Sequence, residues 1–134
     1  MLDALDISAS ALSAQRRRVE VIANNLANAG TTRDALGRVN PYRRQDVVFR
    51  VGMPGGNPAK GVHVERTVQD TSPSRLEHNP GHPDADSEGF VRMPNVSPVI
   101  EMVNMMEASR AYELNVTAMD ATKGLFSAAL RILA

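Results

Sequence analysis

Residues 5–30, LDISASALSAQRRRVEVIANNLANAG, decide the fold of the N-terminal part of the chain. Apolar residues recur there every seven positions, with others three or four positions away: Leu5, Leu12, Val19 and Leu26 form the repeat, and Leu2, Ala9, Ile22 and Ala29 lie beside it. This spacing predicts one long helix with an apolar seam close to that of a coiled coil. Gly30 and the following TTRDALG predict that the helix ends there.

Three asparagines lie in the last two turns of this predicted helix, at Asn24, Asn25 and Asn28. Asparagine is among the weaker helix formers, so their presence needs an explanation. One interpretation is that Asn25 and Asn28 weaken and cap the helix end before Gly30. In the register of the seam, Leu26 faces a partner helix, which places Asn24 and Asn28 on the outer side.

The C-terminal part predicts a second long helix. Its apolar residues also recur every seven positions: Met105, Tyr112, Met119, Phe126 and Leu133 form the repeat, with Met102, Val116 and Leu130 between them. Ser97 followed by Pro98 predicts the start of this helix, with serine as the N-cap and proline at the first helical position. Val99, Val103 and Met106 form a second apolar stripe, so the helix should have two sets of neighbours.

The middle of the chain contains the residues that break helices. All eight prolines lie between Pro41 and Pro98, and only one of the nine glycines lies outside the interval 30–89. RQDVVFRV (44–51) and GVHVERTV (61–68) predict two strands joined as a hairpin by residues 52–60. Residues 70–88 predict a loop leading to a short extended piece, EGFVRM (88–93). We therefore expect a mainly α fold with a small β insertion.

This interpretation divides the chain into an N-terminal helix (1–31), a β-rich middle (32–95) and a C-terminal helix (96–134), which form one structural unit. The two helices should pair as a coiled-coil-like hairpin. A helix from Ser97 to Leu133 would be about 55 Å long, at a rise of about 1.5 Å per residue. A compact domain of this size is only about 36 Å across. The helix ends should therefore be covered by other molecules, which predicts a protein that forms a polymer or a complex.

Composition excludes several classes of function. Fifteen basic and fifteen acidic residues leave a formal net charge of zero, so no general attraction to nucleic acid is expected. The chain has no cysteine, which excludes disulfides and thiolate sites. No stretch approaches the length of about 20 apolar residues that a membrane span needs. The first residues also lack the basic start and apolar run of a secretory signal. Composition alone predicts a soluble, cytoplasmic protein.

Possible chemical sites have simpler interpretations. His78, His82, Asp84 and Asp86 offer the residue types of a metal site, but we interpret them as a turn-rich loop whose aspartates bond backbone amides. No group of Ser, His and Asp lies in a known nucleophile motif, and no glycine loop of the phosphate-binding form precedes a helix, so neither catalysis nor a cofactor is expected.

Two other groups of side chains each allow two interpretations. The run Arg16 to Arg18 is either a solvated helix face or a partner for acidic residues of neighbouring subunits, with Glu101, Glu107 and Glu113 available. Met102, Met105 and Met106 are either core residues or an adaptable contact surface.

Four segments together resemble one known family. They are DISASALSAQRRRVEVIANNLANAGTT (6–32), PYRRQDVVF (41–49), NPGHPDADSEGFVRMPNV (79–96) and EMVNMMEASRAYELNV (101–116). They are similar to bacterial flagellar basal-body rod proteins of the FlgC type, one of the proximal rod proteins, almost from end to end. The pattern ending NNLAN is shared by flagellar axial proteins as a class. The block HPDAD, EGFV and PNV, followed by EM and ASRAY, points to the FlgC type.

The resemblance implies a structural role without catalysis. Proteins of this family are exported through the flagellar type III apparatus by an uncleaved N-terminal signal and polymerise into the rod, which crosses the periplasm and transmits torque. The implied partners are other proximal and distal rod proteins, the rod-base adaptor, the membrane-ring components and the export apparatus, without nucleic acid or insertion into a membrane. The implied location, the basal body, replaces the cytoplasmic location expected from composition. The alternatives are another axial family member and a cytoplasmic helical adaptor.

Two sets of residues are then expected to mediate assembly. Helix pairing is assigned to Leu5, Leu12, Val19, Ile22, Leu26, Met105, Tyr112, Val116, Met119, Phe126 and Leu130. Polar contacts between subunits are assigned to Asn24, Asn28, Arg110 and Asn115. A carboxamide both donates and accepts hydrogen bonds, so Asn24 and Asn28 could fix the register of neighbouring subunits in a way that apolar side chains cannot.

Overall fold

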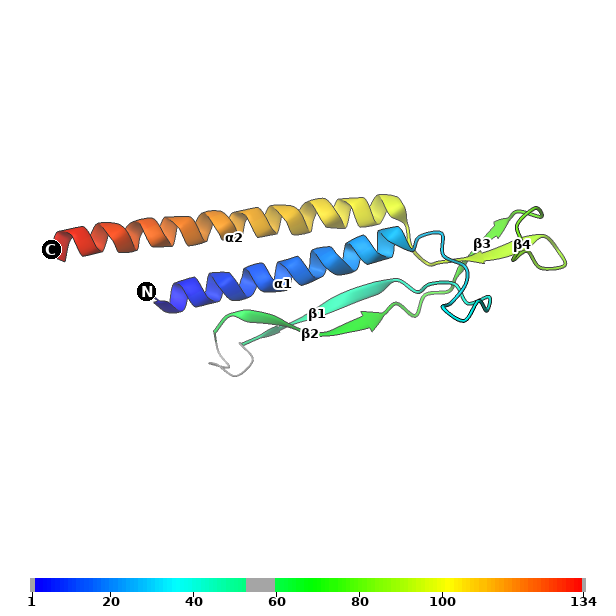
Figure 1. Cartoon of the computed structure of the whole chain (residues 1–134), viewed down its shortest axis with the longest axis horizontal. Helices are drawn as coiled ribbons and strands as arrows, with labels where there is room; N and C mark the ends of the chain where they lie inside the picture. The colour runs from blue at the N-terminus through cyan, green and yellow to red at the C-terminus, as the bar shows by residue number, and fades with distance from the viewer. Residues whose placement is uncertain (1, 53–59, 134) are drawn as a thin grey trace. The chain divides into compact units, whose positions relative to one another are not determined.

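The computed structural model of the chain describes residues 2–52 and 60–133. Along the chain, four strands lie between two long helices (Figure 1). The elements are α1 (Leu2–Ala27), β1 (Gln45–Val51), β2 (Val62–Gln69), β3 (Arg75–His78), β4 (Phe90–Met93) and α2 (Pro98–Leu133). This confirms the predicted fold class, mainly helical with a small β insertion. Most of the segment expected to join the first two strands, residues 53–59, lies outside the described residues.

The ends of the helices follow from local sequence. α2 begins at Pro98 as predicted, and the carbonyl of Ser97 accepts a hydrogen bond from Glu101 N at 3.0 Å. Proline suits this position because its missing N–H would have no partner in the first turn. α1 ends at Ala27, three residues before Gly30, and residues 28–30 form a turn. Ala29 N donates to Leu26 O at 3.3 Å in that turn, which tightens the end of the helix.

The strands form two separate two-stranded sheets. β1 and β2 run antiparallel, because Gly52 N bonds Gly61 O at one end and Asp70 N bonds Arg44 O at the other. β3 and β4 pair antiparallel, from Arg75 opposite Met93 to His78 opposite Phe90. The expectation that residues 70–88 form only a loop was wrong, because this segment contains β3. All four residues of β3 are exposed, so no burial pattern marks the strand.

The chain divides into two compact units, which we describe separately. Unit 1 contains residues 1–20, 47–67 and 106–134, and unit 2 contains residues 21–46 and 68–105, so both helices contribute to each unit. The apolar core of unit 2 is built from Val21, Ile22, Val91 and Val96. Among the described residues of unit 1, the fully buried apolar side chains are only those of Ala14 and Ala108.

Within unit 1, the β1–β2 hairpin contacts α1. Val62 N donates a hydrogen bond to the Ser10 hydroxyl at 3.1 Å, and Lys60 forms an ion pair with Asp3. The helices of this unit lie alongside each other in opposite directions, with Arg18 of α1 near Glu107 of α2 at 3.9 Å (Figure 1). Unit 1 therefore contains the helix pair predicted from the two apolar repeats.

Candidate assembly site

Asn25 is fully buried in unit 2, and its carboxamide uses all of its hydrogen-bonding capacity. Its Nδ2 donates to Gln45 O at 2.7 Å and to Glu101 Oε2 at 2.9 Å. Its Oδ1 accepts from the Tyr42 hydroxyl at 2.9 Å and from Gln45 N at 2.9 Å. A carboxamide offers two donors and two acceptors, and each has a partner here. The interpretation of Asn25 as a residue that only weakens the helix end was wrong.

Glu101 is the second fully buried polar residue of this cluster. Its Oε1 accepts a hydrogen bond from Arg44 Nε at 2.8 Å, so the buried carboxylate has a charged partner. Arg44 also lies 3.3 Å from Asp46 and 3.9 Å from Asp70. The expectation that Glu101 is available to neighbouring subunits was therefore wrong. A buried charge needs a paired and hydrogen-bonded partner, which Arg44 and Asn25 supply.

Two groups of this cluster, Arg44 and Tyr42, have pKa values shifted by burial and by Glu101. Burial lowers the pKa of Arg44, but the hydrogen bonds and charges of Glu101 and Asp46 together outweigh burial and raise the pKa overall. Burial raises the pKa of Tyr42, and the charge of Glu101 raises it further. Arg44 therefore stays a cation and Tyr42 stays a hydroxyl donor. The cluster joins α1, the segment before β1 and the first turns of α2 within unit 2.

Loop residues of unit 2 form a second cluster, around Asp84, whose side chain is 2% exposed. Its Oδ2 accepts from the Thr32 hydroxyl at 2.6 Å, and Arg33 forms an ion pair with its Oδ1. Its backbone N–H donates to His82 Nδ1 at 3.0 Å. The Thr32 hydroxyl and then Arg33 lower the pKa of Asp84 below its ordinary value, in opposition to the effect of burial.

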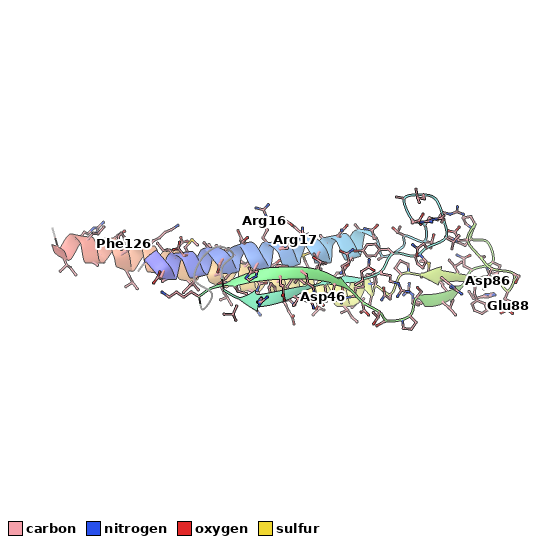
Figure 2. All side chains as sticks on the ribbon, turned by 90° about the horizontal axis from the view of Figure 1, so that it is seen from below. Arg16, Arg17, Asp46, Asp86, Glu88 and Phe126 are labelled. Carbon is pink, nitrogen blue, oxygen red and sulfur yellow. The ribbon has the colours of Figure 1, made fainter. Side chains whose placement is uncertain are left out.

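The turn between β3 and β4 depends on Asp86, which Figure 2 labels together with Glu88. Asp86 Oδ1 accepts hydrogen bonds from Glu88 N and Phe90 N, both at 2.9 Å. This confirms the interpretation of Asp86 as a turn residue, whereas the Asp84 carboxylate binds side chains instead. Within residues 2–52 and 60–133, no group of three or more His, Cys, Asp or Glu side chains is arranged to hold a metal ion.

The residues assigned to helix pairing differ in burial. Ile22 is buried, and six others are half-buried: Leu5, Leu12, Val19, Leu26, Met105 and Met119. The remaining four are exposed, at 38% for Tyr112, 36% for Val116, 38% for Phe126 and 52% for Leu130. The chain alone therefore leaves part of this set in contact with water. Their role in contacts between subunits stays a prediction.

Three of the four residues assigned to polar contacts, Asn24, Asn28 and Asn115, take part in hydrogen bonds within their own chain. Asn28 Nδ2 donates to Asn24 O at 2.9 Å and to Asn24 Oδ1 at 3.2 Å, and Asn28 Oδ1 accepts from the Thr31 hydroxyl at 3.1 Å. Asn115 Nδ2 donates to Ala111 O at 2.8 Å. Asn24 and Arg110 are exposed, whereas Asn28 and Asn115 are half-buried. Contacts of these four residues with other subunits stay a prediction.

Exposed side chains on both helices form the surfaces that another molecule could cover. On α2, the second apolar stripe is open to solvent, with Val99 exposed at 72%, Val103 at 45% and Met106 at 64%. On α1, Arg16 and Arg17 both bind Glu20, at 3.2 and 3.1 Å, and Figure 2 shows them projecting from the helix. The hydrogen bonds from Arg17 and Arg16 lower the pKa of Glu20.

The buried carboxamide of Asn25 and the buried carboxylate of Glu101 bind each other and their neighbours, whereas the second apolar stripe of α2 is exposed. Neither described helix carries an apolar stretch of the length and hydropathy that crossing a membrane requires. The periodicity located the exposed stripes but missed the cluster of Asn25, Arg44 and Glu101. The one signal for that cluster was an unexplained asparagine in a helix.

Comparisons with known proteins agree on one family. A family model described as "Flagella basal body rod protein" matches residues 5–33, and one described as "Flagellar basal body rod FlgEFG protein C-terminal" matches residues 87–132. The chain is 44% identical to the flagellar basal-body rod protein FlgC of Bacillus subtilis (strain 168), covering 96% of this chain and 95% of that protein. It is 46% identical to FlgC of Yersinia enterocolitica and 42% identical to FlgC of Salmonella typhimurium, covering 93% of this chain and 92% of each relative.

Proposed function

We propose that the chain, which belongs to the FlgC family of flagellar basal-body rod proteins, assembles through its two long helices. It is a structural subunit of the rod and not an enzyme. It is located in the flagellar basal body and associates with other rod components. The comparisons do not favour the alternative of a cytoplasmic helical adaptor.

The more specific parts of the proposal concern location and partners. We propose that the chain lies in the part of the rod that crosses the periplasm and helps to transmit torque. Its neighbours there are proximal and distal rod proteins, with the rod-base adaptor and the membrane-ring components nearby. It reaches this position through the flagellar type III export apparatus, without cleavage of a signal peptide.

The exposed apolar side chains of the helices carry the proposal. Val116 and Leu130 belong to the predicted pairing set, yet they are 36% and 52% exposed in the chain alone. Taking such a side chain from full exposure to full burial contributes about 1.5–3 kcal/mol, so covering the third to half of Val116 and Leu130 that is still exposed contributes roughly 0.5–1.5 kcal/mol for each. A second molecule that covers several of them can therefore bind stably, and other rod subunits are the partners that the family supplies.

A complementation experiment tests this function. The gene is deleted, and the strain is supplied with the wild-type chain or with a variant carrying Val116→Ser and Leu130→Ser. The wild type should restore motility and should be recovered in purified basal bodies. The variant should fold, because both positions are exposed, but it should be depleted from basal bodies. The matched control is Leu36→Ser in a loop of unit 2, where the leucine is 75% exposed.

Two results would contradict the proposal. Normal flagella in the deletion strain would show that the chain is not a required rod subunit. Recovery of the wild-type chain only in the soluble fraction would favour the adaptor instead.

A second variant, Asn24→Ala with Asn28→Ala, tests the proposed polar contacts between subunits. Full motility in a strain that carries this variant would contradict these contacts.

A further inference from the structure

A groove in unit 1 separates β2 from α1. Six consecutive residues of β2, 62–67, form one wall, and the other is formed by Ser10, Ser13, Ala14 and Arg17 of α1. Its volume of about 510 Å³ lies within the range of about 300–1,000 Å³ that is usual for ligand sites. Because successive side chains of a strand point to opposite faces, a wall of consecutive residues is the edge of the strand rather than a face. Figure 1 shows the β1–β2 hairpin alongside α1.

Among the described residues, this edge of β2 has no neighbouring strand, because the sheet contains only β1 and β2. Gly61 O accepts a hydrogen bond from Gly52 N, so Gly61 faces β1. Backbone groups alternate in direction along a strand, so those of Val62 and Val64 point to the opposite edge. The Val62 N–H agrees with this direction, because it donates to the Ser10 hydroxyl of α1 at 3.1 Å.

The same alternation holds along β2 as far as Glu65. Glu65 and Arg50 form an ion pair at 2.9 Å, so their side chains lie on one face of the hairpin as diagonal neighbours. At the other end Asp70 N bonds Arg44 O, so the pairing shifts by one residue between Glu65 and Asp70, as in a β-bulge. Val64 lies before this shift, and its N–H and C=O therefore face the groove.

The side chains around the groove leave an excess of positive charge. Arg17 binds Glu20 at 3.1 Å, but Glu20 also binds Arg16 at 3.2 Å. Arg66 lies 3.7 Å from Glu65, which also binds a second arginine, in β1. In each case two guanidinium groups share one carboxylate. A partner that brings carboxylates of its own can therefore form further charge-assisted hydrogen bonds at both arginines that line the groove.

We propose that an extended acidic segment of a partner polypeptide binds this groove as a third strand beside β2. Strand addition of this kind obtains affinity from main-chain hydrogen bonds and specificity from side chains. Val64 supplies a backbone donor and acceptor, and Arg17 and Arg66 select carboxylates. The small side chains of Ser13 and Ala14 leave room for the added chain. The contact goes beyond the proposed function, because it uses the backbone of β2 rather than the exposed apolar side chains of the helices.

Two synthetic peptides test the proposal on the full-length chain. One alternates threonine and glutamate over six residues, the other alternates threonine and lysine, and both have acetyl and amide ends. Fluorescence anisotropy of the labelled peptides should show at least about tenfold tighter binding of the glutamate peptide. Hydrogen exchange of the Val64 amide should slow by at least about tenfold when this peptide is bound, because the amide then has a strand partner.

Substitutions in the chain separate the backbone contribution from the charge contribution. Val64→Pro removes the N–H that faces the groove but no hydrogen bond to β1, so it should weaken binding of the glutamate peptide by at least about tenfold. Val64→Thr keeps the N–H and is the matched control, which should bind like the wild type. Arg17→Glu with Arg66→Glu should reverse the preference toward the lysine peptide. Arg110→Glu, on α2 and outside the groove, should leave the preference unchanged.

Several results would overturn the proposal. Binding of neither peptide, or equal binding of both, would exclude an acidic partner. Equal affinity of Val64→Pro and Val64→Thr for the glutamate peptide would exclude strand pairing. If a lowered urea midpoint shows that Val64→Pro does not fold, exchange of the Val64 amide in the wild type decides instead, and unchanged exchange on peptide binding overturns the pairing. All of these results leave the rod function intact, because that function is judged by recovery of the chain in basal bodies.

Discussion

Asn25 gives a residue-scale test of the buried polar cluster. In Asn25→Ala, the Tyr42 hydroxyl, the backbone of Gln45 and one oxygen of Glu101 lose their partner in a buried site. Leaving buried polar groups without partners should lower the free energy of unfolding by at least about 3 kcal/mol. Urea unfolding measures this loss. Asn24→Ala is the control, and its exposed position predicts a change of less than about 1 kcal/mol. Equal effects of the two variants would show that the cluster does not stabilise the fold.

The charge of Asp84 predicts a dependence of stability on pH. Its pKa is lowered below the ordinary value of 3.8, so the ionised carboxylate stabilises the folded chain above that pH. This contribution is lost as pH falls through the lowered pKa. Asp84→Asn should therefore shift the urea midpoint downward at pH 7, and the difference from wild type should shrink as pH falls below 3.8.

The matched control for Asp84→Asn is Asp120→Asn, a substitution at a side chain that is 69% exposed. It should leave the urea midpoint nearly unchanged at both pH values, because exposed ion pairs contribute little. A constant difference between Asp84→Asn and wild type across the whole pH range would show that the side-chain shape of Asp84 matters rather than its charge.

At this scale the helical pattern predicted that Asn24 and Asn28 lie on the outer side of the helix. Asn24 is exposed and Asn28 is half-buried, and their contacts with other subunits stay a prediction. The pattern could not identify Asn25 as a buried residue. Its partners Tyr42 and Gln45 lie in a loop and at a strand start that return to the helix 17 and 20 residues later, and no local pattern encodes that return.

At the scale of elements, alanine substitutions at three glycines distinguish the cost of a positive φ from the cost of too little room for a Cβ atom. A Cβ added at Gly30 would meet no atom within 4 Å, and the φ of Gly30 is not positive, so Gly30→Ala should be neutral or stabilise by up to about 1 kcal/mol. Gly37 has a φ of +75° with open space, so Gly37→Ala should cost about 1–2 kcal/mol. Gly89 has a φ of +80°, and an added Cβ would lie 3.0 Å from Pro80 Cγ and 3.2 Å from His78 Nε2.

Gly89→Ala should therefore destabilise more than Gly37→Ala, since it adds crowding in the β3–β4 turn to the strain of a positive φ. Thermal unfolding of the three variants should rank them in the order Gly30, Gly37, Gly89, with the last having the lowest midpoint. A Gly89→Ala midpoint equal to that of Gly37→Ala would show that Pro80 and His78 move aside without cost.

The strands show which elements the sequence could predict. β1 contains the β-branched and aromatic run Val47, Val48 and Phe49, and β2 alternates apolar and polar residues; both strands were predicted within one residue of their ends. β3 was missed because Arg75–His78 has no β-branched residue and no buried face. Its partner β4 and the Asp86 turn define it instead, through the pairing of His78 with Phe90, whose rings meet edge to face at 5.0 Å. A strand held mainly by its partner has no strong pattern of its own.

At the scale of the whole molecule, unequal burial predicts unequal stability in the free chain. Unit 2 buries Val21, Ile22, Val91 and Val96 around its polar cluster, whereas unit 1 fully buries only two alanines among its described apolar side chains. Helices with so little burial are marginal in water, because most helix stability in proteins comes from packing. Hydrogen exchange of the dilute chain should therefore be slow at residues 98–105 and fast at residues 114–132.

Assembly should remove this difference, because neighbours then cover the exposed stripes of α2. Exchange at residues 114–132 should slow by at least about tenfold in purified basal bodies, while residues 98–105 change little. Mass spectrometry of peptides from both segments gives the comparison, and a dilution series of the free chain excludes self-association as the cause of protection. Equal, concentration-independent protection of the two segments in the dilute chain would mean that α2 is stable without neighbours, and assembly would then not be needed to complete its fold.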